Sequence, residues 1–116
     1  MSNQIDAYES GYRRYAEAFG RAALKGDTKG TRENFAKLAA VRAKLKACGR
    51  EGEALLRCLM RDSSDAVAVR AAIDSLPFAE EESLEVLDAI ARKSGPMAFD
   101  ARMTAKLWRA GGLRKR

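Results

Sequence analysis

The side chains that most often perform acid–base catalysis and bind metals are largely missing from this chain of 116 residues. It contains no histidine, which excludes Ser-His-Asp and Cys-His catalysis and removes the imidazole ligands of zinc sites. It has no Walker A sequence and no Rossmann glycine pattern. Cys48 and Cys58 do not make a metal site, and their apolar helical contexts predict reduced, buried thiols. We therefore expect a protein that is not an enzyme and that needs no metal or cofactor.

Carboxylates are concentrated in one short segment, which contains Glu80, Glu81, Glu82 and Glu85. Such a cluster suggests a divalent-cation site, but consecutive acids on a helix point in different directions and do not converge on one ion. Acids in the first turn instead complement the positive end of the helix dipole. We expect the same four residues to contribute to an acidic docking surface for a protein partner.

A second group of charged residues lies around a predicted turn and consists of Asp62, Asp65 and Arg70. An acid in a turn can cap the helix that follows it. An arginine early in that helix can pair with the acids of the turn. We predict structural hydrogen bonds between Arg70 and these acids, with no catalytic role.

Basic side chains provide the chemistry for binding phosphate. Lys37, Arg42, Lys44 and Lys46 fall within about ten residues of one another, and phosphate binding needs only clustered cations. No base-reading sequence motif accompanies them. A polyanion such as nucleic acid is therefore the alternative partner, bound weakly and without sequence preference through these residues and the basic tail 111–116.

Aromatic side chains form a stripe at helical spacing near the start of the chain: Tyr8, Tyr12, Tyr15 and Phe19. A stripe of this kind can stack nucleic-acid bases, but it is more typical of a helix–helix seam. Trp108 is expected to pin the last helix onto the rest of the protein, with its indole N–H near the surface.

Helices must position all of these side chains. Apolar residues recur at spacings of three and four, and no sustained alternation predicts a strand. Gly26, Gly49, Pro77 and Gly95 interrupt the pattern, and Thr28 or Thr31 is expected to cap the second helix. The predicted helices cover residues 4–25, 31–48, 51–61, 66–76, 79–93 and 100–110.

The length predicts one helical domain over residues 1–113. Within it we expect a basic helix pair (4–49), a middle group of helices (50–95) and a C-terminal helix (96–110). Charge follows this division: Lys and Arg outnumber Asp and Glu eleven to five in residues 1–50 and six to none in 101–116, whereas acids outnumber bases eleven to five in 51–100. The net charge of +6 thus conceals an acidic middle between two basic ends.

The segment from Leu59 to Leu76 resembles a HEAT repeat, because an acidic turn is followed by Val-Arg, paired alanines and leucine. Further short matches place residues 10–113 close to a small bacterial HEAT-like family catalogued as a domain of unknown function; they are Asn34-Phe35, Leu45-Lys46, Glu53-Ala54-Leu55-Leu56, Met103-Thr104 and Gly111. The resemblance implies an all-α compact array of five to six helices, with a HEAT-like helical hairpin in the second half. It also implies protein binding as the general role.

These observations predict a non-catalytic protein–protein interaction module. One concrete form is an immunity or regulatory protein that binds and covers a partner such as a toxin. The N-terminal residues do not look like a signal peptide, and no stretch approaches the roughly 20 apolar residues of a membrane span. We therefore expect a cytoplasmic protein with no membrane partner.

Overall fold

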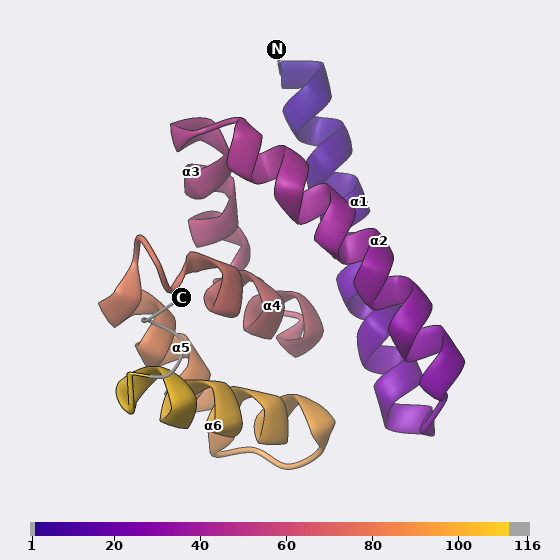
Figure 1. Ribbon diagram of the computed structural model, residues 1–116, viewed down its shortest axis with the longest axis vertical. Helices are drawn as coiled ribbons and strands as arrows, with labels where there is room; N and C mark the ends of the chain where they lie inside the picture. The colour runs from indigo at the N-terminus through magenta and orange to yellow at the C-terminus, as the bar shows by residue number, and fades with distance from the viewer. Residues whose placement is uncertain (1, 112–116) are drawn as a thin grey trace.

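The protein is built from α-helices. Figure 1 shows them in a computed structural model, which describes residues 2–111. The six helices are α1 (Ser2–Lys25), α2 (Thr28–Ala47), α3 (Arg50–Leu59), α4 (Asp65–Ser75), α5 (Glu80–Ala91) and α6 (Pro96–Arg109). Residues 2–111 contain no strand. The predicted all-α array of five to six helices is confirmed, whereas the tail 112–116 lies outside the described residues.

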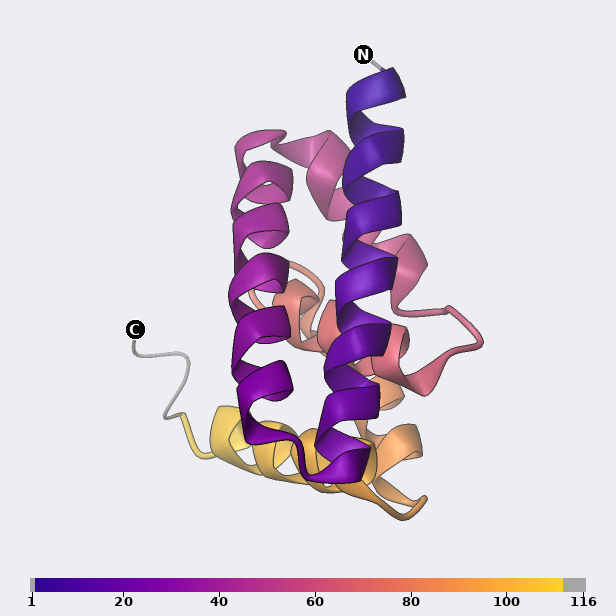
Figure 2. The same ribbon diagram turned by 90° about the vertical axis from the view of Figure 1, so that its right-hand side faces the viewer.

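The two longest helices, α1 and α2, form an antiparallel hairpin, which Figure 2 shows side by side. Gly26 turns the chain between them with φ +71°, a conformation that favours glycine. The cap predicted at Thr28 or Thr31 is wrong. Asp27 caps α2, because its carboxylate accepts a hydrogen bond from the Gly30 N–H at 2.9 Å and both threonines lie inside the helix.

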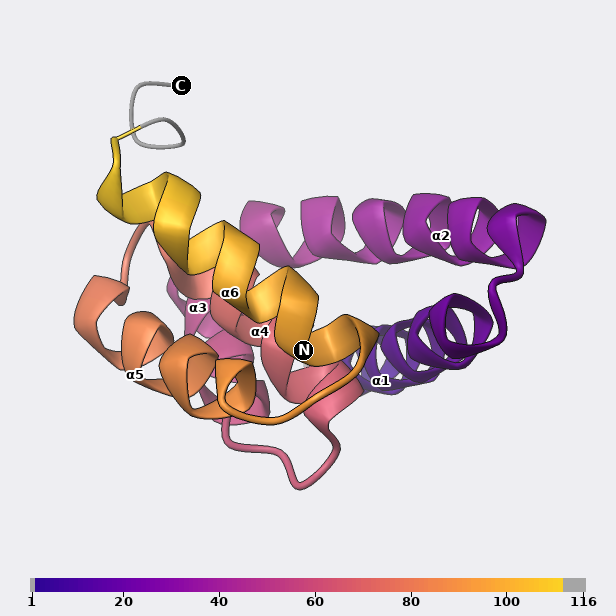
Figure 3. The same ribbon diagram turned by 90° about the horizontal axis from the view of Figure 1, so that it is seen from below.

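Helix α4 is the centre of the second half. It contacts α1, α3, α5 and α6, and Figures 1 and 3 show it enclosed by these elements. Its small and branched apolar side chains are buried, as expected for a helix packed on several sides: Val67, Ala68, Val69, Ala71 and Ala72. The hairpin of α1 and α2 meets this group mainly through α1, while α2 stands away from α4 (Figure 3).

A glycine sets the close approach of α2 and α3. Gly52 is buried, and a β-carbon at this position would overlap the backbone carbonyl of Leu45 at the end of α2. The backbones can therefore meet here only because residue 52 has no side chain. This contact fixes one end of the opening between α2 and the rest of the protein.

Some predictions of burial need correction. Cys58 is exposed and Cys48 is half-buried, so the thiols are not both buried, although both are free. The buried side of α6 is formed by alanines and Trp108, whereas Met103 and Leu107 of the same helix are exposed. Trp108 behaves as predicted: it is 9% exposed and its indole N–H donates to Glu80 at 3.0 Å. No helix in residues 2–111 combines the length and apolar character needed to cross a bilayer.

Candidate binding cleft

A cleft of about 630 Å³ separates α2 from α3, α4 and the turn that follows α4. A volume of this size is typical of a binding site for a small ligand or a few partner side chains. Its apolar lining includes Leu56, Ile73 and Phe78. Small residues on α2, Ala39 and Ala43, keep the opposite side open.

The two sides of the cleft carry opposite charges. Arg42 and Lys46 come from α2 and lie one helical turn apart, whereas Glu53 and Asp74 come from α3 and α4. Arg42 makes one contact in the cleft, from Nη1 to Asp74 Oδ1 at 3.4 Å, so most of its five donors are not used within the described residues. The cleft therefore presents a basic side, an acidic side and an apolar floor between them.

A buried polar pair lies behind this charged lining. The Tyr12 hydroxyl donates to Asp74 Oδ2 at 2.6 Å, and the Asp74 side chain is only 9% exposed. Burial raises the pKa of Asp74, although the Tyr12 hydrogen bond and the nearby Arg42 act in the opposite direction. Burial and the neighbouring carboxylate also raise the pKa of Tyr12 well above its usual value. The pair joins α1 to α4 and fixes the acidic side of the cleft.

The predicted pairing of Arg70 with the acids of the turn is wrong. Arg70 Nη2 donates to Asp100 of α6 at 2.6 Å, and its guanidinium lies 5.2 Å from the centroid of the Phe19 ring. Arg70 is nearly buried, and its ion pair is made with Asp100 and not with an acid of the turn. Its contacts link α1, α4 and α6, a structural role as expected but with other partners.

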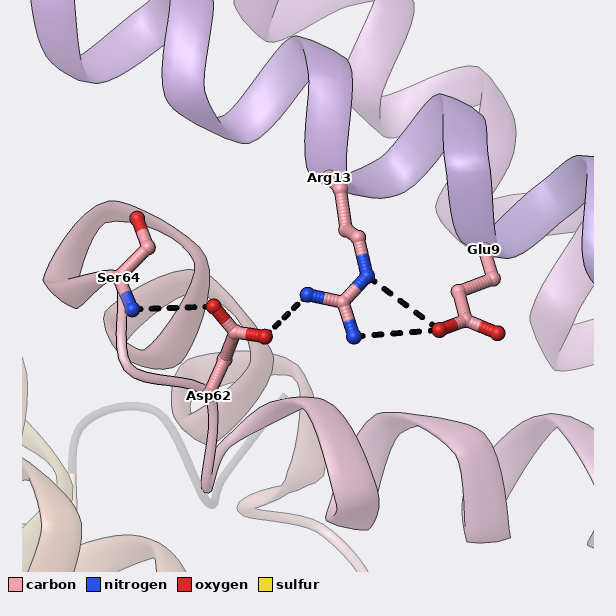
Figure 4. Close-up of polar contacts among 4 residues, drawn as sticks. All are labelled: Glu9, Arg13, Asp62 and Ser64. Atoms are coloured by element: carbon pink, nitrogen blue, oxygen red, sulfur yellow. Dashed lines mark hydrogen bonds and ion pairs between the residues drawn. The ribbon is translucent and has the colours of Figure 1, made fainter.

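The acids of the turn have partners from other helices, as Figure 4 shows for Asp62. One carboxylate oxygen accepts from Arg13 of α1, which is also held by Glu9, and the other accepts from the Ser64 N–H at 3.0 Å. The Ser64 backbone bond and Arg13 together lower the pKa of Asp62. Asp65 pairs with Lys93 at 2.8 Å. The turn is therefore fastened to α1 and to the end of α5.

The four predicted acids of α5 do not form one open surface. Glu82 accepts hydrogen bonds from Arg61, in the turn after α3, and from Arg57 of α3, and both lower its pKa. Glu80 accepts from Trp108. Glu81 and Glu85 make no ion pair within residues 2–111. Within the same residues no group of acids, cysteines or histidines is arranged to hold a metal ion.

The four predicted basic residues of α2 are divided between two faces. Arg42 and Lys46 line the cleft. Lys37 and Lys44 lie over tyrosine rings of α1, with each ammonium 5.8 Å from a ring centroid, Lys37 on Tyr15 and Lys44 on Tyr8. We call the first pair the inner face of α2 and the second the outer face. The four residues therefore do not share one face of α2.

Sequence reasoning missed the polar pair of Tyr12 and Asp74. Tyr12 was placed in the aromatic seam, which is correct, since its side chain is fully buried. The available signal was Asp74 itself, an acid on a short helix otherwise rich in buried apolar residues. A buried acid on such a helix requires a donor, and a tyrosine hydroxyl in the seam is a suitable one.

No protein-family model, curated protein or solved structure matches this chain. Function is therefore inferred from the cleft and the charges around it.

Proposed function

We propose that the protein is a non-catalytic protein-binding module and that the cleft beside α2 receives a segment of its partner. The cleft itself carries this proposal. It offers apolar side chains, Leu56, Ile73 and Phe78, together with charged ones, and an apolar centre with a charged rim is the usual anatomy of a protein–protein interface. The resemblance of α3 and α4 to a HEAT-like hairpin supports the same role, because such hairpins commonly bind proteins.

The charges of the cleft indicate the chemistry of the partner segment. An acidic side chain would lie against Arg42 and Lys46, where donors are available. A basic side chain would lie against Glu53 on the opposite side. An apolar side chain between them would bury the floor. A short amphipathic helix that carries an acidic, an apolar and a basic side chain can place each one against its complementary part of the cleft in one orientation only.

The cleft is a better docking surface than the acidic start of α5. Glu80 and Glu82 are already bound to groups of this chain, so a partner would have to displace those groups to use them. A toxin or another regulated protein remains our proposed class of partner, but it would be recognised by a mixed-charge segment rather than by basic charge alone.

The proposal is tested by filling the cleft without disturbing the core. Ala43 lines the cleft and is exposed, so Ala43→Trp adds bulk where the partner should bind. Ala40→Trp is the matched control, because Ala40 is exposed on the same helix outside the cleft lining. Each full-length variant is used to capture proteins from a lysate of the native host. A protein recovered by the wild type is then purified and titrated by calorimetry.

We expect Ala43→Trp to weaken the purified complex by about tenfold or more, because it occludes a hot spot, and Ala40→Trp to leave the affinity within about twofold. Lys46→Glu should also weaken binding, since it reverses the charge expected to meet an acid. Equal affinities for the two tryptophan variants would contradict the cleft as the binding site. Loss of binding on charge reversal of Glu81 and Glu85 alone would place the site on α5 instead.

A further inference from the structure

The outer face of the α1–α2 hairpin carries cations that no acid of the described chain neutralises. Arg14, Lys37 and Lys44 all lie over tyrosine rings, with the Arg14 guanidinium 5.7 Å from the Tyr15 centroid. None of the three makes an ion pair within residues 2–111. Glu33, one turn before Lys37, shares this side of α2 by helical spacing and also makes no ion pair.

The spacing of these groups is regular along the hairpin. Tyr8 and Tyr15 are seven residues apart on α1, and Lys44 and Lys37 are seven residues apart on the antiparallel α2. Each lysine meets one tyrosine, so the two cation–tyrosine units lie about 10 Å apart along the helices.

This elongated basic surface is suited to a linear polyanion. The tyrosine rings hold the stems of the lysines in place while the ammonium groups stay exposed. The described clefts do not include these residues, so a small anion would find no enclosure here. A polymer that presents many phosphates needs no enclosure. Its affinity comes from the counterions that are released each time an exposed cation meets a phosphate.

We infer that the outer face binds the phosphate backbone of duplex nucleic acid without reading its sequence. A duplex is favoured over a single strand because Tyr8 and Tyr15 are half-buried and covered by cations, which leaves no open aromatic platform for unpaired bases. It is favoured over a membrane because the large exposed apolar residues, such as Leu24 and Phe99, are not among the groups that form this surface.

The test measures binding of a short fluorescent duplex by anisotropy, with the full chain, between about 50 and 200 mM salt. Lys37→Glu/Lys44→Glu reverses both outer-face lysines. Lys46→Glu/Lys106→Glu is the control with the same change in net charge, because both residues are exposed and make no ion pair but lie in the cleft and on α6. Lys37→Gln/Lys44→Gln repeats the test with neutral side chains, and circular dichroism checks that every variant is folded.

We expect the wild type to bind with a slope of log affinity against log salt of about −3, as for three phosphate contacts, and the outer-face reversal to weaken binding at least tenfold at low salt. The control should weaken binding by less than threefold. Equal weakening by the two double variants would overturn the inference. So would tighter binding of a single strand, or binding of vesicles of phosphatidylglycerol and phosphatidylcholine with no binding of the duplex.

Discussion

The inner and outer faces of α2 carry the same kind of residue but use it differently. On the inner face Arg42 meets the buried Asp74, which is itself held by Tyr12 of α1. On the outer face Lys37 and Lys44 rest on tyrosine rings and meet no acid of the described chain. On the inner face Arg42 is therefore held by a contact within the protein while it lines the cleft, whereas the outer-face lysines have no acidic partner in the described chain. The function of a cluster of cations in a sequence can therefore be inferred only after each cation has been assigned to a face of its helix.

The first way to break the comparison is to alter the geometry of the inner face. Gly52→Ala should lower the free energy of unfolding by about 3 kcal/mol, because the new methyl group overlaps the Leu45 carbonyl and backbone cannot yield as a side chain does. Gly49→Ala is the control: it has open space around it, so only its φ of +62° should cost about 1 kcal/mol. Urea denaturation measures both. Equal losses in the free energy of unfolding for the two variants would mean that the backbones of α2 and α3 do not come close together at residue 52.

The second prediction concerns the buried carboxylate. Asp74→Ala should cost about 2 kcal/mol, since it leaves the buried Tyr12 hydroxyl without an acceptor and removes the partner of Arg42. Glu33→Ala, which removes an exposed acid beside the outer face, should change stability by less than about 0.5 kcal/mol. If the two variants were equally stable in urea, the inner face would be no more structural than the outer one.

The positions of the helices could be predicted from the sequence, but most of the charged contacts could not. Apolar spacing and the breaks at Gly26, Gly49 and Gly95 locate the helices to within a few residues. Arg70 shows the limit. The acids of the preceding turn were its predicted partners, yet its partner is Asp100, thirty residues away on α6. Ion pairs depend on how helices pack, which periodicity alone does not specify.

The candidate site was only partly predictable for the same reason. Arg42 and Lys46 were identified as functional cations and they do line the cleft, but as part of a mixed-charge surface. The role of Asp74 was missed because an acid on a helix of apolar residues can be interpreted only when the group that donates a hydrogen bond to it is known. Glu82 was expected to face a partner, but it pairs instead with Arg57 of α3 and with Arg61 of the turn that follows α3.

A third prediction uses pH to distinguish the acid of the inner face from the acid of the turn. The pKa of Asp74 is raised in the folded protein, so the folded state binds its proton more tightly and this residue favours folding increasingly as the pH falls. The stability of the wild type relative to Asp74→Asn should therefore increase from about pH 7 to about pH 4.

Asp62 should behave in the opposite way, because its pKa is lowered by Ser64 and Arg13. Its stabilising effect is present at neutral pH and is lost as the pH falls through its folded pKa. The advantage of the wild type over Asp62→Asn should therefore shrink mainly as the pH falls from about 5 toward about 3. Denaturation of the three proteins at several pH values measures both trends, and two trends of the same sign would refute the difference in environment.

The smallest expected effect is on the stability contributed by the outer face. Lys37→Ala and Lys44→Ala should each cost about 0.5 kcal/mol, the usual contribution of an exposed cation over an aromatic ring. Thermal denaturation in low salt is sensitive enough to detect a loss of stability of this size. A loss of about 2 kcal/mol for either variant would show that the outer face is structural too, and the contrast between the faces would disappear.

The most direct test of the partner site is a hydrogen-exchange footprint of the purified complex. Backbone amides of the wild-type chain are compared with and without the captured partner, with Ala43→Trp as the variant that should lose the footprint. We expect slowed exchange in the segments that line the cleft, residues 39–46, 53–56 and 73–78. Slowed exchange confined to residues 80–85, with no change around the cleft, would contradict the account.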